Sequence, residues 1–169
     1  MPTLEEVARQ PVEQRLARME RTADDFATAI HGVTEAVLSR RPDEKNWAAK
    51  EIVCHLRDIE ELWTVRAQTV LLAEDQMFLR NYPDRWAQER QYLLNDAAHA
   101  LAAFRIRRQE ALELFRKLSP TELQRTCNHA VLGRITIDRI VGLIAWHDDN
   151  HLDQLEPPSK VRPDVPHVE

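Results

Sequence analysis

Two histidines near the C-terminus, His147 and His151, are spaced so that both could bind one metal ion. Residues four apart in an α-helix lie on one face with Cβ atoms about 5–6 Å apart, so both imidazoles can reach the same ion. The segment before them is apolar up to Trp146 and then reads His-Asp-Asp-Asn-His. Polar groups in a core-facing segment are costly to desolvate. The pair therefore predicts two ligands of a metal site.

A third histidine, His55, lies between Cys54 and Leu56 in another apolar segment and is the candidate third ligand. Glu51 and Asp58 lie about one turn to either side, where either could orient an imidazole or bind the ion directly. Three neutral histidines leave coordination positions for water or substrate, which is typical of catalytic metal sites. A core histidine bonded to a carbonyl is the alternative interpretation of His55 taken by itself.

Two other metal chemistries compete for the same residues. His147-Asp148-x-x-His151 resembles the HExxH helix of zinc proteases, with Asp148 as a short general base, but only 18 proline-rich residues follow to supply a third ligand. A ferritin-like di-iron site needs Glu-x-x-His on two helices, and here only Asp148-x-x-His151 and Asp96-x-x-His99 approach that pattern. The three-histidine site ranks above both.

The other histidines and the two cysteines suggest no further site. Cys127 and His129 could form a metal pair, but nothing nearby in the sequence completes it. We assign surface or structural roles to His31, His99, His129 and His167. Cys54 and Cys127 are isolated and lack CxxC spacing, which favours reduced thiols over a disulfide.

Amphipathic helices are the elements that must position these histidines. Apolar residues recur at three-to-four spacing in four segments, which we expect to form long helices at about 12–30, 48–74, 95–118 and 137–156. Thr136 is the predicted N-cap of the last helix. The other face of the third helix is basic and is expected to be solvated.

The connections are expected to be short or irregular. A brief helix is predicted at 35–38 and another at about 86–92, with Pro83 as a breaker before it. The segment 121–135 is expected to be a long connection with one helical turn at its start. Four long helices predict an all-α four-helix bundle in one domain, residues 1–156, followed by a proline-rich tail, 157–169.

The sequence resembles the DinB/YfiT-like superfamily of bacterial metal-binding four-helix bundles. The motifs that carry the resemblance are Asn46-Trp47-x-x-Lys50-Glu51-Ile52-Val53-x-His55-Leu56-x-Asp58-x-Glu60, then Gly133-Arg134-x-Thr136, then Ala145-x-His147-Asp148-x-x-His151-Leu152-x-Gln154. Their order and separation make the combination more specific than each short motif, and the match spans about residues 12–156.

The resemblance implies a divalent metal, commonly zinc or nickel, bound by His55, His147 and His151 with water completing the shell. It also implies a bundle with a long crossover between the second and third helices, and frequent homodimers. Activities implied by the family are metal-dependent hydrolysis and S-transfer with a low-molecular-weight thiol as co-substrate.

The enzyme hypothesis and the non-catalytic hypothesis predict different residues around the ion. Thiol transfer would need basic residues at the entrance of the site to bind the acidic groups of the thiol, and Arg66, Arg85 and Arg90 are candidates. In the non-catalytic alternative the ion is structural, with Asp58 or Glu51 closing its shell, or the protein is a stress-related binding module. We favour the enzyme, acting on a small-molecule substrate.

Composition limits the remaining partners. The net charge of −5, with basic and acidic residues intermixed, provides no electrostatic footprint for nucleic acid. No run of about 18 apolar residues and no basic start before an apolar stretch is present, so we expect neither a membrane span nor a secretory leader. A cytoplasmic protein is expected.

Overall fold

A computed structural model describes residues 2–155 of the chain. The predicted proline-rich tail at 157–169 and His167 lie outside the described residues, and the domain boundary at 156 stays a prediction.

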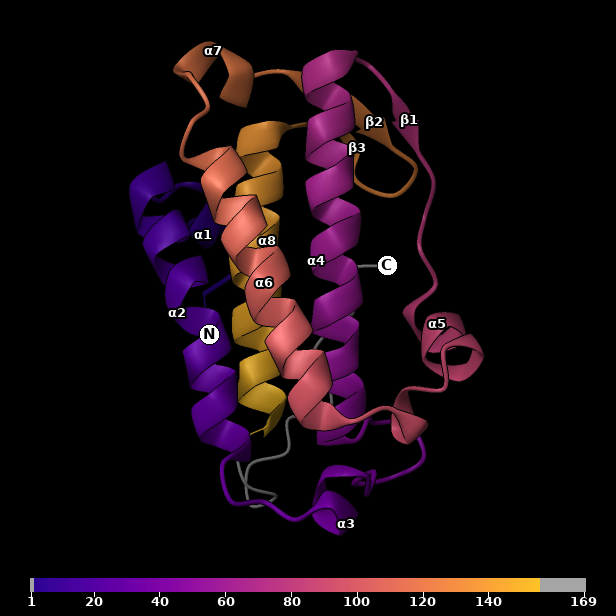
Figure 1. The fold of residues 1–169 in the computed structure, drawn as a ribbon. Coiled ribbons are helices and arrows are strands. Elements are labelled where there is room, and N and C mark those ends of the chain that lie inside the picture. The colour runs from indigo at the N-terminus through magenta and orange to yellow at the C-terminus, as the bar shows by residue number, and fades with distance from the viewer. Residues whose placement is uncertain (1, 156–169) are drawn as a thin grey trace.

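Four long helices form the bundle, as the apolar spacing predicts (Figure 1). They are α2 (Val12–Ile30), α4 (Ala49–Leu72), α6 (Ala97–Phe115) and α8 (Ile137–Leu155). Helices α4 and α6 run in one direction, and α2 and α8 run in the other. The most extensive helix contacts join α4 to α6 and α2 to α8, so each parallel pair is also a packed pair.

A long connection between α4 and α6 makes their parallel arrangement possible. It contains β1 (Met77–Phe78), α5 (Pro83–Glu89) and the 3-10 helix η1 (Tyr92–Leu94), and it returns the chain along α4 (Figure 1). The expected crossover is therefore present. Pro83 is not a breaker here but the first residue of α5, a position where the missing N–H costs no helical hydrogen bond.

Three further short helices lie within the described residues. They are α1 (Leu4–Ala8), α3 (Glu35–Leu38) and α7 (Pro120–Leu123). Helix α7 is the single turn expected after residue 120, and α1 was not predicted. Thr136 caps α8 as expected, because its Oγ1 accepts a hydrogen bond of 3.1 Å from the backbone N–H of Arg139.

A small sheet replaces part of the irregular connection expected at 121–135. Strands β2 (Thr126–His129) and β3 (Gly133–Thr136) form an antiparallel hairpin, and β1 pairs in parallel with β2. Gly133 begins β3 with a φ of +69°, a left-handed conformation that favours glycine. The sheet lies at the end of α4 remote from its N-terminus (Figure 1).

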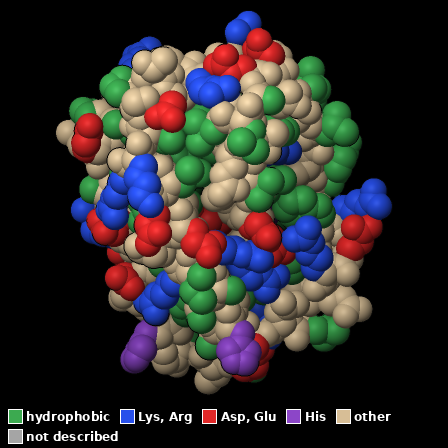
Figure 2. All heavy atoms as spheres, turned by 45° about the horizontal axis from the view of Figure 1, so that its top comes forward, with side chains coloured by type: hydrophobic (Ala, Val, Ile, Leu, Met, Phe, Trp, Pro, Cys, Tyr) green, Lys and Arg blue, Asp and Glu red, His purple; other side chains and the backbone are tan. Residues whose placement is uncertain are grey.

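The surface of the bundle carries charged side chains of both signs. In the face shown in Figure 2, acidic and basic side chains are interspersed, and ion pairs such as Arg105 with Asp24 and Arg116 with Glu20 join α6 to α2. Within residues 2–155, no helix is both long and apolar enough to cross a membrane.

Candidate metal centre

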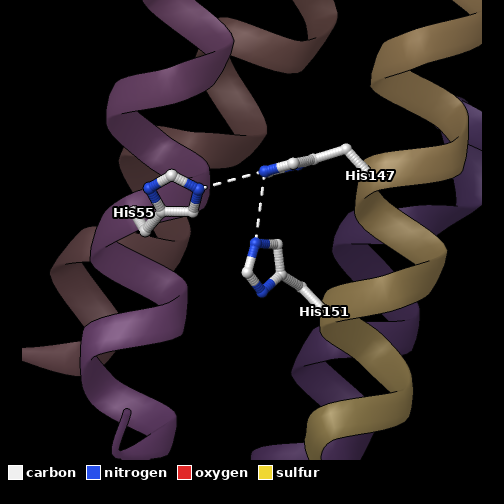
Figure 3. Close-up of side chains that lie close together, drawn as sticks. All are labelled: His55, His147 and His151. Carbon is white, nitrogen blue, oxygen red and sulfur yellow. Dashed lines mark hydrogen bonds between the residues drawn. The ribbon is translucent and has the colours of Figure 1, made fainter. Parts of the chain in front are cut away.

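The bundle brings His55, His147 and His151 together from two helices (Figure 3). His55 lies on α4, and the other two lie one turn apart on α8. The Nε2 atom of His147 is 3.0 Å from Nε2 of His55 and 3.2 Å from Nε2 of His151. His55 and His151 are buried, and the side chain of His147 is 13% exposed. We call these three residues the histidine cluster.

The spacing of the cluster suits a single ion. Three nitrogens bound to one tetrahedral ion at about 2.0–2.1 Å are separated from each other by about 3.3 Å, close to the two Nε2–Nε2 distances observed here. In the part of the chain that the structure describes, no Asp, Glu or Cys side chain joins this group of potential ligands.

The partner of its Nδ1 atom orients the ring of His151. His151 Nδ1 lies 2.8 Å from Oε1 of Gln154, an oxygen that can only accept, so His151 donates from Nδ1 and keeps its Nε2 lone pair for the cluster. His147 Nδ1 lies 3.8 Å from Oδ1 of Asp148. The lone pair of His151 therefore points towards Nε2 of His147, an arrangement that a shared cation would stabilise.

Trp47 packs against the cluster from the segment before α4. Its ring lies 4.9 Å from that of His55, edge to face, and is stacked parallel to that of His151 with centroids 6.3 Å apart. The indole Nε1 of Trp47 donates a hydrogen bond of 3.0 Å to Asp84 of α5. The α4–α6 connection thus helps to fix the position of Trp47 beside the cluster.

A buried ion network lies directly beside the cluster and consists of Glu60, Arg108 and Asp148. Arg108 of α6 donates to both carboxylate oxygens of Glu60 at 2.8 and 2.7 Å, and its Nη1 lies 2.7 Å from Asp148. The same Nη1 donates to the carbonyl of Met19 on α2 at 2.9 Å. All three side chains are at most 2% exposed. The network therefore joins all four long helices.

Arg108 is the shared counter-ion of both carboxylates in the ion network. Burial raises the pKa of both carboxyl groups, and at Glu60 this effect prevails. At Asp148 burial is again the largest single effect, but the charge and hydrogen bond of Arg108, together with the neighbouring His147, outweigh it and leave the pKa below its ordinary value. Because Asp148 is buried and paired, it is poorly placed to act as the base of a protease-like site. The expectation that the basic face of α6 is solvated is wrong for Arg108, which lies on the apolar stripe between Phe104 and Leu112.

The two carboxylates considered as extra ligands are engaged elsewhere. Glu51 accepts two hydrogen bonds from Arg41, at 2.7 and 2.6 Å, and a third from the backbone N–H of Ala48 at 3.0 Å. This third bond satisfies a free donor at the start of α4. Glu51 therefore stabilises the helix that carries His55.

Asp58 binds cationic side chains and a phenol on the α5–η1 side of α4. It accepts hydrogen bonds from Arg57 at 2.6 Å, from Arg90 at 2.6 Å and from Tyr92 at 2.9 Å. Burial would raise the pKa of Asp58, but these hydrogen bonds hold it below its ordinary value. Asp58 thus anchors the connection to α4.

The remaining candidate residues do not join the histidine cluster. His99 is 92% exposed, and Asp96 is the N-cap of α6, so the di-iron pattern is not assembled. Cys54 and Cys127 are both free, and burial raises the pKa of Cys54 to about 11. His129 is buried on β2.

The three candidate arginines differ from one another. Arg85 is 70% exposed and pairs with Glu89, and Arg90 pairs with Asp58. Arg66 is buried. The three arginines therefore do not form a common basic entrance to the site.

Comparisons with known proteins agree with the fold. The family model for the DinB superfamily matches residues 18–155. The solved structure of YfiT from Bacillus subtilis, described as "a probable metal-dependent hydrolase with an unusual four-helix bundle topology", aligns with a TM-score of 0.78 and 20% identity over 92% of this chain and 86% of that one.

Two curated proteins, each named "Putative metal-dependent hydrolase", are similar in sequence. The one from Oceanobacillus iheyensis is 28% identical over 107 residues, 63% of this chain and 61% of that protein. The one from Halalkalibacterium halodurans is 24% identical over 132 residues, 75% of this chain and 76% of that protein. The match thus spans about three fifths of the length of the Oceanobacillus protein.

Proposed function

The chain belongs to the DinB superfamily, and on that premise we propose that it is a divalent-metal-dependent hydrolase of a small molecule, with the ion held by His55, His147 and His151. The observation that carries the proposal is the convergence of three imidazoles with no protein carboxylate or thiolate among them in the described residues. The names of the two curated relatives support the same class of reaction.

The ligand set favours an open site. With three ligands supplied by the protein, a tetrahedral ion keeps one position for water or substrate. Glu51 and Asp58, which would close a structural site, are held by Arg41 and by the arginines around Asp58. Imidazole donors suit zinc and nickel among the divalent metals. When bound, such an ion would polarise a scissile carbonyl and make water a nucleophile near neutral pH.

The surrounding residues have supporting tasks. Gln154 fixes the proton of His151 on Nδ1, so Nε2 is available to the ion. Trp47 restricts the rotation of two ligand rings. The ion network carries one net negative charge beside His147 when both carboxyl groups are ionised, which complements a cation.

Activity measurements test the proposal. We expect zinc- or nickel-loaded protein to hydrolyse members of a panel of small esters and amides, a chelator to abolish the activity, and added metal to restore it. His55→Ala should remove the activity, and Gln154→Ala should reduce it by about 10–100-fold, the usual loss for an outer-shell partner of a ligand.

A parallel arm measures conjugation of a low-molecular-weight thiol to an electrophile. Metal-dependent conjugation without hydrolysis would replace the hydrolase with an S-transferase. Metal binding with neither activity would favour a structural ion or a binding module.

A further inference from the structure

Arg66 is a buried cation that has no anionic partner among the residues that the structure describes. It is 6% exposed, and burial lowers its pKa to about 10. In residues 2–155, no carboxylate lies within ion-pair distance of its guanidinium, and its one oxygen acceptor is the carbonyl of Leu79 at 2.7 Å. A guanidinium carries five N–H donors, so most of its donor capacity is not used by oxygen.

Aromatic rings surround the guanidinium but carry no net charge. Its central carbon lies 4.7 Å from the ring centroid of Trp63 and 5.4 Å from that of Phe78. These cation–π contacts compensate part of the lost hydration. Arg108 is also buried, but it is paired with two carboxylates. Among the described residues, Arg66 has no such carboxylate partner.

The hydrogen bonds of His129 determine which of its nitrogens carries the proton. Its Nδ1 accepts from the backbone N–H groups of Val131 and Leu132, both at 3.3 Å, in the turn between β2 and β3. Burial, and then the charge of Arg66, lower the pKa of His129, so the ring is neutral. A neutral imidazole has one N–H, and with Nδ1 as acceptor that proton lies on Nε2.

Two donors therefore face each other. Nε2 of His129 lies 3.4 Å from Nη1 of Arg66, and with the imidazole proton on Nε2 both atoms carry hydrogen. Such a pair is stabilised when an acceptor lies within reach of both. We propose that Arg66 and His129 form a binding site for a compact, singly charged anion, which accepts hydrogen bonds from both side chains.

The burial of the two side chains limits the size of the anion. Arg66 and His129 are 6% and 3% exposed, so the site suits a halide or a single carboxylate group rather than a phosphate ester or a macromolecule. Arg66 lies eleven residues after His55 on α4, which corresponds to about 16 Å along the helix axis. The anion site is thus separate from the histidine cluster and does not depend on the hydrolase proposal.

Thermal unfolding with added anions tests the site. Metal-loaded protein is prepared in a chloride-free HEPES buffer at constant ionic strength, with sodium gluconate as the bulky replacement salt. Chloride, bromide and formate are then titrated separately to 100 mM. If chloride binds with a Kd of about 10 mM, the melting temperature should rise by about 3 °C or more. Formate tests whether the site also accepts a carboxylate, and chloride alone acting would restrict it to halides.

Two variants and one crystal structure distinguish the site from a general salt effect. Arg66→Met should abolish the rise, and Arg85→Met, at an exposed arginine paired with Glu89, should keep it. In crystals of the unmodified protein grown with bromide, an anomalous peak is expected within about 3.5 Å of Nη1 of Arg66 and Nε2 of His129. An equal rise in Arg66→Met, or the absence of a bromide peak within reach of both atoms, would overturn the proposal.

Discussion

The histidine cluster and the ion network are neighbours on the same helices but differ in how their polar groups are satisfied. In the ion network, one guanidinium lies within 2.9 Å of two carboxylates and a carbonyl on three other helices. In the histidine cluster, three ring nitrogens converge on each other, and the described chain brings no opposite charge into the group.

This difference separates a structural role from a functional one. A buried charge needs a partner, and the ion network contains its own, so it can stabilise the packing of the helices without any ligand. The ring nitrogens of the histidine cluster converge on each other, so a cation bound there would supply the charge that the cluster does not contain. We therefore expect mutations in the network to change mainly stability, and mutations in the cluster to change mainly metal binding.

The largest effect on stability is expected for Arg108→Met. The substitution leaves Glu60 and Asp148 buried without their cation, so the free energy of unfolding at pH 7 should fall by about 3–5 kcal/mol, as measured by urea denaturation. The loss should become smaller as the pH falls and the two carboxyl groups take up protons.

Arg105→Met is the matched control for this variant. Arg105 lies one turn earlier on α6 and pairs with Asp24 at the surface, so its loss should cost at most about 1 kcal/mol. Similar losses for the two variants would show that the ion network does not carry the stability assigned to it.

A smaller effect is expected for Asp58→Asn, on the other side of α4. The pKa of Asp58 is lower in the folded protein than its ordinary value of 3.8, so its ionised form stabilises the fold above that pH. We expect a loss of about 1–3 kcal/mol at pH 7. The difference from the unmodified protein should shrink as the pH falls below 3.8 and through the folded pKa.

Metal uptake by Asp58→Asn sharpens the comparison. Because Asp58 is held by Arg57 and Arg90, its loss should leave the metal content unchanged. A variant that folds but no longer takes up metal would show that Asp58 is needed for metal binding. The distinction between ligands and supporting carboxylates would then be lost.

The elements with long apolar periodicity were predictable from the sequence. Helix α2 was predicted at 12–30 and observed at Val12–Ile30, because its stripe of buried residues is regular. The hairpin of β2 and β3 was missed because each strand has four residues, too few to show a clear alternation. The role of Pro83 depends on whether a helix begins there, which local sequence leaves open.

The three histidines could be grouped from sequence, but their neighbours could not. Two of them share one helix face, and the third, His55, was marked by its position in another apolar segment. Two of the partners of Glu51 and Asp58 come from segments brought close only by folding, namely Arg41 before α4 and Arg90 after α5. Arg108 fits the spacing of the apolar stripe on α6, a signal that could have marked it as buried.

Metal analysis of the purified protein tests the central claim most directly. After equilibration with zinc or nickel and removal of unbound metal, mass spectrometry should find one ion per chain in the unmodified protein and in His99→Ala, whose histidine is exposed. His55→Ala, His147→Ala and His151→Ala should each lose the bound ion while remaining folded. An unmodified protein without stoichiometric metal, or three histidine variants that all retain it, would contradict the assignment of these residues as ligands.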